Sequence, residues 1–336
     1  MDLKNRISAL SGLGRYLNHI HPDDLEELIH ATHAHNAWFD EESVLAAIEG
    51  IKVLLEESNM SSFVAQYDLK VPLDKKIGIV MAGNIPAVGF HDLLMVLLSG
   101  CEAYIKPSQQ DEVLLKFLVN HLLEIESEFK IYFVEQLVLN DLDAVIATGS
   151  NNTARYFETY FSKLPNVIRK SRTSVAVLSG DESKEEIEAL GKDIFRYYGL
   201  GCRNVTKVYV PEGYDFVFML DSLQSYSRVI YQHKYDNNYN YHKSVYLING
   251  REHLDTGFLM VTEDDGLHSP LSVLFYETYK TLGEVKKKVL DQKEFLQCVA
   301  SNIKSIKGSV LLGQTQSPKI SDYADGVDII DFLQKM

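Results

Sequence analysis

The first seventy residues carry apolar side chains at steps of three and four, which is the spacing of amphipathic helices. Three segments show this pattern: SALSGLGRYLNHI, DDLEELIHATHAHNAWF and EESVLAAIEGIKVLLEES. Asp23 or Asp40 is expected to cap its helix, since an aspartate accepts hydrogen bonds from first-turn amides. No turn-rich linker follows, so we expect residues 1–70 to form a helical segment that packs on the next domain.

From residue 76 short apolar runs alternate with amphipathic stretches. We predict strands at KIGIVMAG, CEAYIK, LDAVIATG and NVIRK, and helices at GFHDLLMVLLSG, DEVLLKFLVNHLLEIES and NNTARYFETYFSKL. Asp111 stands near the start of the second of these helices. Such alternation predicts a parallel sheet covered on both faces, with ligands beyond the carboxyl ends of its strands.

A second alternating region begins at SVAVLSG. The helix SKEEIEALGKDIFRYYG and the strand TKVYVPEG follow, and FLMVT, PLSVLFYE, the helix LGEVKKKVLDQ and SVLLGQ complete the layer. Residues 231–246 are rich in Tyr, Asn and His, and we interpret them as an ordered excursion that either lines an acyl pocket or packs as a surface loop. The pattern as a whole predicts an α/β fold with two domains.

The composition is that of a soluble globular protein, with 336 residues, 46% hydrophobic and 24% charged. No run of about eighteen apolar residues appears, so we expect no membrane span. The first residues lack the apolar core and cleavage site of a secretion signal, which favours the cytoplasm. The net charge of −14 disfavours nucleic acid as a partner, because phosphate backbones attract basic surfaces.

Local clusters of basic and histidine residues change this picture little. Lys163, Arg169, Lys170 and Arg172 fall within ten positions. They form either a solvated strand edge or a local phosphate-binding site. The histidines at positions 30, 33 and 35 lie in an amphipathic helix without a carboxylate or cysteine at ligand geometry, so we predict no metal site.

Three cysteines are too few and too scattered for a disulfide framework. Cys101 and Cys298 are expected to be small buried residues of apolar strands. Cys202 differs because it follows Gly199-Leu200-Gly201, between a predicted helix and a predicted strand. Glycines allow a sharp turn that would present the thiol in a cleft, beside amides able to hold an oxyanion.

The chemistry of Cys202 is open at this point. Arg203 or a helix terminus could lower its thiol pKa and make it a nucleophile, since the thiolate is the reactive form. The alternative is a small residue in a tight turn. No His, Asp or Asn accompanies Cys202 at a spacing typical of a cysteine protease, which weakens a protease function as a further alternative.

The stretch IGIVMAGNIPAVGFHDLLMVLLSGCEAYIKPS carries further candidates. It lacks the glycine fingerprint of the usual dinucleotide fold. Lys106 nevertheless ends a strand, where it can reach ribose hydroxyls, and Asn84 can donate an amide hydrogen to an oxyanion. In VIATGSNNTARYF, Gly149 and Ser150 end a strand just before a helix, a natural place for a diphosphate.

These motifs, in this order, resemble the aldehyde dehydrogenase superfamily over roughly residues 76–334. AGNIPAVGF, the compact Gly-Cys turn and SDYADGVDIIDFL most resemble the acyl-CoA reductases that are similar to the LuxC fatty-acid reductase of bacterial bioluminescence. The resemblance implies two α/β domains with parallel-rich sheets, an active-site cleft between them and an oligomerising element, which leaves a homo-oligomer open. It implies a cofactor-binding domain at 71–173, a catalytic domain at 174–312 and a C-terminal segment, 313–336, that returns to the cofactor domain or an oligomer interface.

The resemblance also implies roles for individual residues. Cys202 would be the nucleophile and Asn84 the oxyanion donor. Lys106 and Ser108 would hold the adenosine ribose or its 2′-phosphate, and Gly149-Ser150 the diphosphate. The cofactor would be NADPH or NADH, and coenzyme A would be part of an acyl-CoA substrate.

Two departures from the superfamily pattern narrow the function. The run Glu-Leu-Gly-Gly-Lys of hydrolytic members, whose glutamate activates water, corresponds here to residues 169–173, RKSRT, without a carboxylate. Water attack on an acyl-enzyme should therefore be slow. The run Glu-x-Phe-Gly-Pro corresponds to GLHSPLSV, where the glutamate is absent and His268 either donates a proton to the aldehyde oxygen or is structural.

The sequence therefore predicts an enzyme, an NAD(P)H-dependent reductase that converts an acyl-CoA to an aldehyde through a thioester on Cys202. Two alternatives stay open. One is reduction of an acyl phosphate, as in glutamyl-phosphate reductases. The other is a member of the superfamily that binds nucleotide or acyl groups without turnover.

Overall fold

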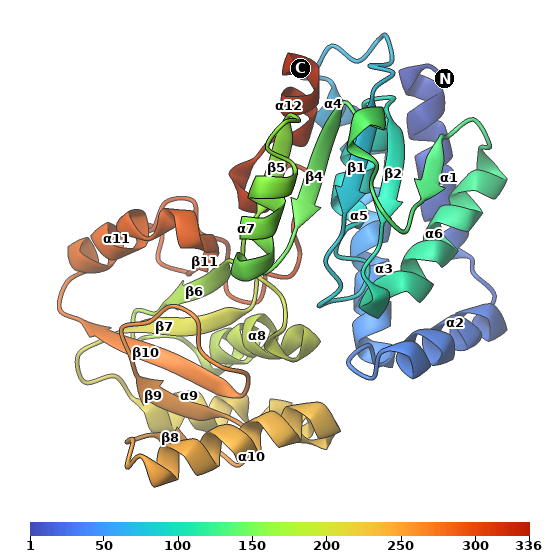
Figure 1. The fold of residues 1–336 in the computed structure, drawn as a ribbon. Helices are drawn as coiled ribbons and strands as arrows, with labels where there is room; N and C mark the ends of the chain where they lie inside the picture. Colours follow the sequence, from blue (N-terminus) through green and yellow to red (C-terminus); the bar gives the residue numbers. More distant parts are fainter. The chain divides into compact units, whose positions relative to one another are not determined.

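The computed structural model describes residues 1–336 (Figure 1). The chain divides into two compact units. Unit 1 contains residues 1–171 and 319–336, and unit 2 contains residues 172–318. Each unit is built around a parallel-rich sheet with helices packed against it, so the predicted α/β class is confirmed. No helix in the chain is long and apolar enough to cross a membrane.

The N-terminal part of unit 1 is helical, as predicted. Its helices are α1 (Leu3–Asn18), α2 (Pro22–His35), α3 (Glu41–Leu54) and α4 (Glu57–Val64). Asp40 caps α3 by accepting a hydrogen bond from the Ser43 amide at 2.9 Å. The prediction for Asp23 was wrong, because His21 is the N-cap of α2. Pro22 explains the shift, since proline favours the first helical position and moves the cap to the residue before it.

The sheet of unit 1 is entirely parallel and has the order β3-β2-β1-β4-β5. The strands are β1 (Lys76–Val80), β2 (Glu102–Lys106), β3 (Ile131–Phe133), β4 (Ala144–Thr148) and β5 (Asn166–Arg169). The short β3 was not predicted, whereas the other four were. Because the chain leaves β1 toward β2 and later returns beside β1 as β4, the two halves of the sheet are wound in opposite directions. A ligand crevice is expected where this winding reverses, at the carboxyl ends of β1 and β4.

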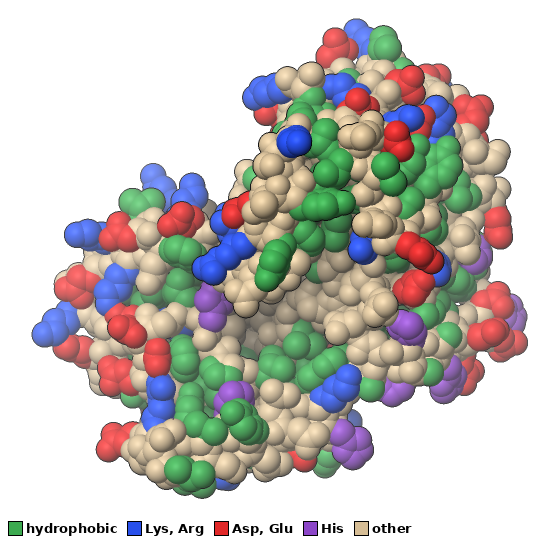
Figure 2. Space-filling model, in the orientation of Figure 1, with side chains coloured by type: hydrophobic (Ala, Val, Ile, Leu, Met, Phe, Trp, Pro, Cys, Tyr) green, Lys and Arg blue, Asp and Glu red, His purple; other side chains and the backbone are tan.

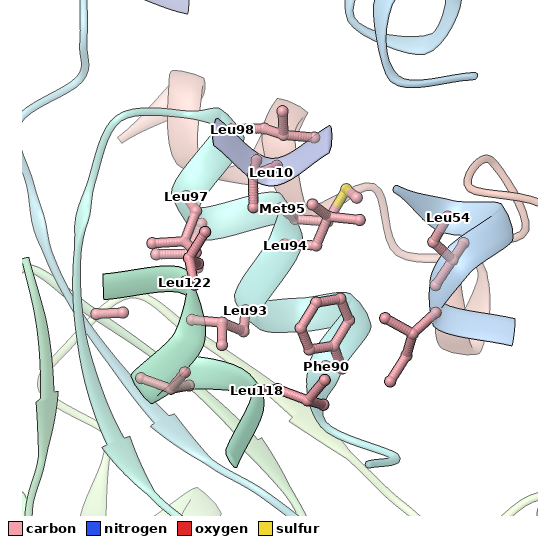
Figure 3. Packing of buried hydrophobic residues seen from close by; sticks show 14 of the residues in the cluster. Leu10, Leu54, Phe90, Leu93, Leu94, Met95, Leu97, Leu98, Leu118 and Leu122 are labelled. Carbon is pink, nitrogen blue, oxygen red and sulfur yellow. The ribbon is translucent and has the colours of Figure 1, made fainter. Parts of the chain in front are cut away.

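Helix α5 (Phe90–Leu98) forms the centre of unit 1, where it packs against α1, β1 and β2. All of its residues except His91 are buried. Its apolar side chains lie among Leu10 of α1, Leu54 of α3, and Leu118 and Leu122 of α6 (Glu112–Ile125) (Figure 3). Each buried leucine contributes roughly 1.5–3 kcal/mol relative to an exposed one, which joins the helical segment firmly to the sheet.

The last residues of the chain belong to unit 1. Helix α12 (Ile329–Lys335) packs on α5 with Ile330 and Leu333 buried. The Tyr67 hydroxyl donates to Asp328 at 2.7 Å, which ties this segment to the end of the helical region.

Unit 2 has a six-stranded sheet of order β11-β6-β7-β10-β9-β8, parallel except for the pair β8-β9. The strands are β6 (Thr173–Val177), β7 (Val205–Pro211), β8 (Leu254–Asp255), β9 (Met260–Glu263), β10 (Val273–Tyr279) and β11 (Leu296–Ala300). The helices are α8 (Lys184–Phe195), α9 (Phe216–Ser222), α10 (His233–Ile248) and α11 (Leu282–Asp291). SVLLGQ is not a strand, because only Val310 forms a bridge, to Ala300.

The aromatic-rich segment 231–246 was wrongly interpreted as an excursion, because most of it forms helix α10. Tyr235, Tyr239 and Tyr246 are its buried residues, at steps of four and seven that place them on one helical face. Tyr239 and Tyr246 pack with apolar side chains of β9 and β10. The many Asn and Tyr residues disguise the pattern, because tyrosine counts weakly as apolar although its ring is buried here.

Candidate active site

Cys202 lies in a tight turn between α8 and β7. Helix α8 ends at Phe195, and the non-helical segment Arg196–Gly199 follows it. Tyr197 and Tyr198 have φ angles of 52° and 57°, and Gly199 has 81°, so three successive residues are left-handed. Non-glycine residues in this region cost about 1–3 kcal/mol each and persist only where surrounding contacts hold them.

Hydrogen bonds fix the backbone on both sides of Cys202. The Asn204 amide donates to the Gly201 carbonyl at 3.1 Å, which closes a turn with Cys202 as its second residue. The Gly201 amide donates to Asn204 Oδ1 at 2.8 Å, and Ser174 Oγ donates to the Cys202 carbonyl at 3.1 Å. Cys202 itself is half-buried in a loop that these hydrogen bonds hold. Sequence reasoning missed Ser174 and Asn204, for which the only signal is a polar residue beside the Gly-Cys motif.

The other two cysteines differ from Cys202, and none of the three forms a disulfide. Cys101 is buried just before β2, and burial raises the pKa of its thiol to about 11. Cys298 lies in β11 but is only half-buried, which corrects the expectation of a fully buried residue. Burial still raises the pKa of the Cys298 thiol, and its Sγ lies 3.0 Å from Ser174 Oγ.

Arg203 was expected near the Cys202 thiol. Its Nη1 donates to the Thr315 carbonyl at 3.5 Å, and its guanidinium also lies beside Cys298. The Arg203 guanidinium therefore lies beside Cys298, and its effect on the pKa of the Cys202 thiol stays a prediction.

The loop between β9 and β10 carries His268 and lies beside the cysteine turn. Thr206 Oγ1, at the start of β7, donates to the Leu267 carbonyl at 2.6 Å. The Leu271 side chain lies against Gly199, where an added Cβ would be 3.5 Å from it, at ordinary contact distance. His268 itself is exposed, although nearby atoms desolvate its ring enough to lower its pKa. Cys202 and His268 thus belong to the same edge of the sheet in unit 2.

This edge is formed by the amino ends of the strands. The Cys202 turn precedes β7, Ser174 is near the start of β6 and the His268 loop precedes β10. The thiol therefore lies at the amino edge of this sheet, whereas the carboxyl-end rule was stated for the sheet of unit 1. The physical reason is connectivity, because a connection from a helix into a parallel strand must arrive at the amino end of that strand.

In unit 1 the predicted cofactor residues lie at the carboxyl ends of the strands. Lys106 is the last residue of β2, Asn84 follows β1, and Gly149-Ser150 follow β4. Because β2, β1 and β4 are adjacent parallel strands, these residues gather at one edge of the sheet. The structure thus brings the expected oxyanion donor and the expected cofactor residues together.

The N-terminus of α7 (Asn151–Tyr160) fits an anionic group. Its first residues are exposed, and its free amides and positive dipole end favour phosphate. Ser150 is the N-cap, since its Oγ accepts the Thr153 amide at 3.2 Å. A Cβ on Gly149 would lie 3.0 Å from the Thr153 side chain, so glycine lets the strand end pack closely on the helix.

Lys106 and Ser108 are placed differently from each other. Lys106 is exposed at the end of β2. Ser108 Oγ accepts the Gln110 amide at 3.2 Å and so caps the 3-10 turn Gln109–Asp111. A Cβ on Gly83 would lie 2.5 Å from Ser108, so the Asn84 loop packs directly against this serine. Ser108 therefore has a structural task beside the ligand role expected of it.

Comparison with known proteins decides the family. The chain matches the acyl-CoA reductase (LuxC) family over residues 26–307, which is most of its length. The chain belongs to the LuxC acyl-CoA reductase family. No curated protein sequence matches it.

Solved structures agree with the fold of this LuxC-family chain. Aldehyde dehydrogenase 21 from Physcomitrella patens, in complex with succinate, aligns with a TM-score of 0.69 at 14% identity, covering 100% of this chain and 84% of that one. An NADP-dependent enzyme from E. coli gives 0.66 at 14% identity, covering 90% and 73%. The NAD+ complex of an aldehyde dehydrogenase from Bacillus cereus gives 0.64 at 15% identity, covering 91% and 73%. The aldehyde-dehydrogenase-like fold is thereby confirmed.

In this LuxC-family chain the Asn84 loop rests on Asp111, a residue that sequence reasoning noted only as a helix start. The carboxylate is 4% exposed and accepts hydrogen bonds from the amides of Ala87 and Val88. Ala87 has a left-handed φ of 53°, so these bonds hold a strained loop. Burial raises the Asp111 pKa from 3.8 to about 7.

Two residues of the basic cluster, Arg169 and Lys170, have protein partners. Arg169 is 4% exposed, and its Nη2 donates to Asp92 at 2.6 Å while Nη1 donates to the Ala324 carbonyl. Lys170 pairs with Glu158 at 2.7 Å. Arg169 and Lys170 are thus bound to protein partners, which favours a structural role for these two side chains over phosphate binding. Acidic and basic side chains are also interspersed on the face shown in Figure 2. The chain contains no cluster of three His, Cys, Asp or Glu side chains that could hold a metal ion.

Proposed function

We propose that the protein reduces an acyl-CoA to an aldehyde, with a reduced nicotinamide as hydride donor and Cys202 as the acyl carrier. The observation that supports this best is the hydrogen-bonded Gly-Cys turn in a chain of the LuxC acyl-CoA reductase family. A residue that merely packs in a turn would not need three left-handed residues before it. Such strain is typical of functional sites.

The chain's own groups carry the acyl transfer. The Cys202 thiolate attacks the thioester carbonyl, and the C–S bond to coenzyme A breaks, so that the coenzyme leaves as its thiol after taking up one proton. The product is an acyl thioester on Cys202. Asn84 and the Cys202 amide are proposed to donate hydrogen bonds to the oxyanion, which is the charge that develops in the transition state.

A bound nicotinamide supplies the hydride that reduces this thioester. Lys106 and Ser108 are proposed to hold the adenosine ribose or its 2′-phosphate, and the exposed first turn of α7 behind Gly149-Ser150 the diphosphate. NADPH is our preferred donor, because a 2′-phosphate would give the exposed Lys106 an anionic partner. His268 is proposed to donate a proton to the thiohemiacetal oxygen and to take it back when the C–S bond breaks, which releases the aldehyde and the Cys202 thiolate.

The residues beside the site favour acyl transfer over hydrolysis. Residues 169–173 contain no carboxylate, and Arg169 there is bound to Asp92. Asp193, a buried carboxylate at the end of α8, accepts hydrogen bonds from the Gly313 and Thr315 amides and from Thr315 Oγ1. These donors bind the Asp193 carboxylate within the protein, so we propose that it does not activate water.

Mass spectrometry after incubation with a panel of acyl-CoAs tests the nucleophile and the substrate together. We expect a stoichiometric acyl adduct on Cys202 without the reductant, and release of aldehyde when NADPH is added. Cys202→Ala should abolish the adduct and leave NADPH binding unchanged, whereas the matched variant Cys298→Ala should acylate normally.

Other results would contradict the proposal. An acyl group trapped on a different residue would show that Cys202 is not the carrier. Acylation by acyl phosphates but not by CoA thioesters would assign the substrate to the other class. Alkylation gives an independent check, because Cys202 should react with iodoacetamide much faster than Cys101 and Cys298, whose pKa values are raised by burial. Equal rates for the three thiols would argue against catalysis.

A further inference from the structure

Asn204 is the most heavily bonded side chain around the cysteine turn. It is completely buried, two residues after Cys202. Its Nδ2 donates to the carbonyl groups of Asp193 at 3.1 Å, Ile194 at 3.2 Å and Arg196 at 2.8 Å. The last carbonyl groups of a helix have no partner within the helix. Asn204 therefore caps the C-terminal end of α8 from a position beyond the turn.

Asn204 also binds the cysteine turn itself. Its Oδ1 accepts the Gly201 amide at 2.8 Å, and its backbone amide donates to the Gly201 carbonyl at 3.1 Å. The amide and the carbonyl of Gly201 are thus both bonded to one residue. One consequence is that the Gly201 amide is bound inside the turn, where it cannot serve an oxyanion.

The strained backbone before Cys202 explains why these hydrogen bonds from Asn204 matter. Tyr197 and Tyr198 are left-handed at a cost of about 1–3 kcal/mol each. The shortest bond from Asn204 Nδ2 goes to Arg196, the residue directly before them. Without Asn204, residues 196–201 could relax toward ordinary helical or extended angles, and Cys202 would move with them.

We infer that Asn204 is a positioning residue for the nucleophile, because its side chain locks the Cys202 turn onto the end of α8. This inference rests on the proposed function, in which Cys202 carries the acyl group. Asparagine suits the task because its amide is an acceptor on one side and a double donor on the other. Aspartate keeps the acceptor but has no donor, and it places a negative charge beside three carbonyl oxygens.

Two variants, Asn204→Ala and Asn204→Asp, test the inference. Single-turnover acylation with an excess of acyl-CoA is followed by mass spectrometry, and Cys202 alkylation is followed from pH 6 to pH 9. A misplacement of about 1 Å can lower a rate by about 10²-fold. We expect an acylation rate lower by that order, with the acyl-CoA KM within about threefold and the NADPH dissociation constant unchanged, since rate rather than binding depends on the placement of the thiol.

A stability control separates positioning from a general loss of structure. Val210→Ala removes buried methyl groups at the far end of β7 and should cost about 1–3 kcal/mol. It is expected to lower the melting temperature comparably but to leave the acylation rate within about twofold. If Asn204→Ala does not fold, Asn204→Asp, which keeps the size and the Gly201 acceptor, is compared with the same control.

The outcomes separate this inference from the proposed function. Acylation of both folded Asn204 variants at the wild-type rate, or an equal loss in Val210→Ala, would overturn the positioning role. If the wild-type Cys202 takes up no acyl group from any donor, the proposed function fails. The alkylation profile then still decides whether Asn204 positions the thiol, because iodoacetamide requires no substrate site.

Discussion

Replacing Asp111 by asparagine is expected to make unit 1 more stable, increasingly so as the pH rises. In the wild type, burial raises the Asp111 pKa from 3.8 to about 7. Between these pH values the unfolded chain loses its proton while the folded protein keeps it. Wild-type stability therefore falls as the pH rises through this window, and the loss is complete above about pH 7. Asparagine does not titrate, so the variant lacks this loss.

The magnitude follows from the two pKa values. One pKa unit corresponds to about 1.4 kcal/mol, so the whole loss is roughly 4 kcal/mol. The gain of Asp111→Asn over the wild type should increase by about 2.5 kcal/mol between pH 5 and pH 8, since part of the loss has already occurred at pH 5. Asparagine keeps an acceptor for the Ala87 and Val88 amides, so the Asn84 loop should survive and acylation at pH 7 should persist.

Urea unfolding at pH 5, 6, 7 and 8 measures this difference. Trp38 is the only tryptophan and packs against the core of unit 1, so its fluorescence reports the unit that contains Asp111. Asp141→Asn, at an exposed position of the same unit, is the control and should show no such trend. Parallel stability curves for the wild type and Asp111→Asn from pH 5 to pH 8 would refute the reasoning, because the carboxyl group would then not be kept neutral by burial.

Two further predictions concern the buried ion pair and His268. Arg169→Ala should lower the stability of unit 1 by about 3–5 kcal/mol in urea, because Asp92 is left buried without its partner. The exposed Lys170→Ala should cost less than about 1 kcal/mol, and an equal loss in both would contradict the buried-pair argument. Since nearby atoms desolvate its ring and lower the His268 pKa, less of the ring is protonated at a given pH, and a proton-donating role predicts aldehyde release that slows as the pH rises. His268→Asn should then lower the rate about 10²-fold or more at acidic pH and remove this dependence, whereas an unchanged pH–rate profile would show that the histidine is structural.

Much of the fold could be predicted from local patterns. The strands at KIGIVMAG and TKVYVPEG are short apolar runs, and the helix SKEEIEALGKDIF begins with a capping box in which Ser183 and Glu186 bond reciprocally. Such signals depend on residues within one or two turns of each other, so the sequence carries them directly. Segment 231–246 failed because the apolar face of its helix consists of tyrosines.

The candidate site was predictable only in part. Cys202, Asn84, Lys106 and Gly149 are marked by glycines and strand ends that are visible along the chain. The residues that hold these side chains in place show no such signal in the sequence. Asp111 reads as the start of a helix, although its carboxylate supports a loop more than twenty residues earlier.

The sequence by itself determined the alternation of strands and helices, the place of the Gly-Cys turn and the family. Only the tertiary structure decided which polar side chains hold these elements together through hydrogen bonds and ion pairs. Arg169 became the partner of Asp92, 77 positions away, instead of a phosphate ligand, and Ser174 and Asn204 became the anchors of the cysteine turn. The physical reason is range: periodicity and turn chemistry act between neighbours in the chain, whereas burial and hydrogen-bond partners are set by which distant segments the sheets bring together.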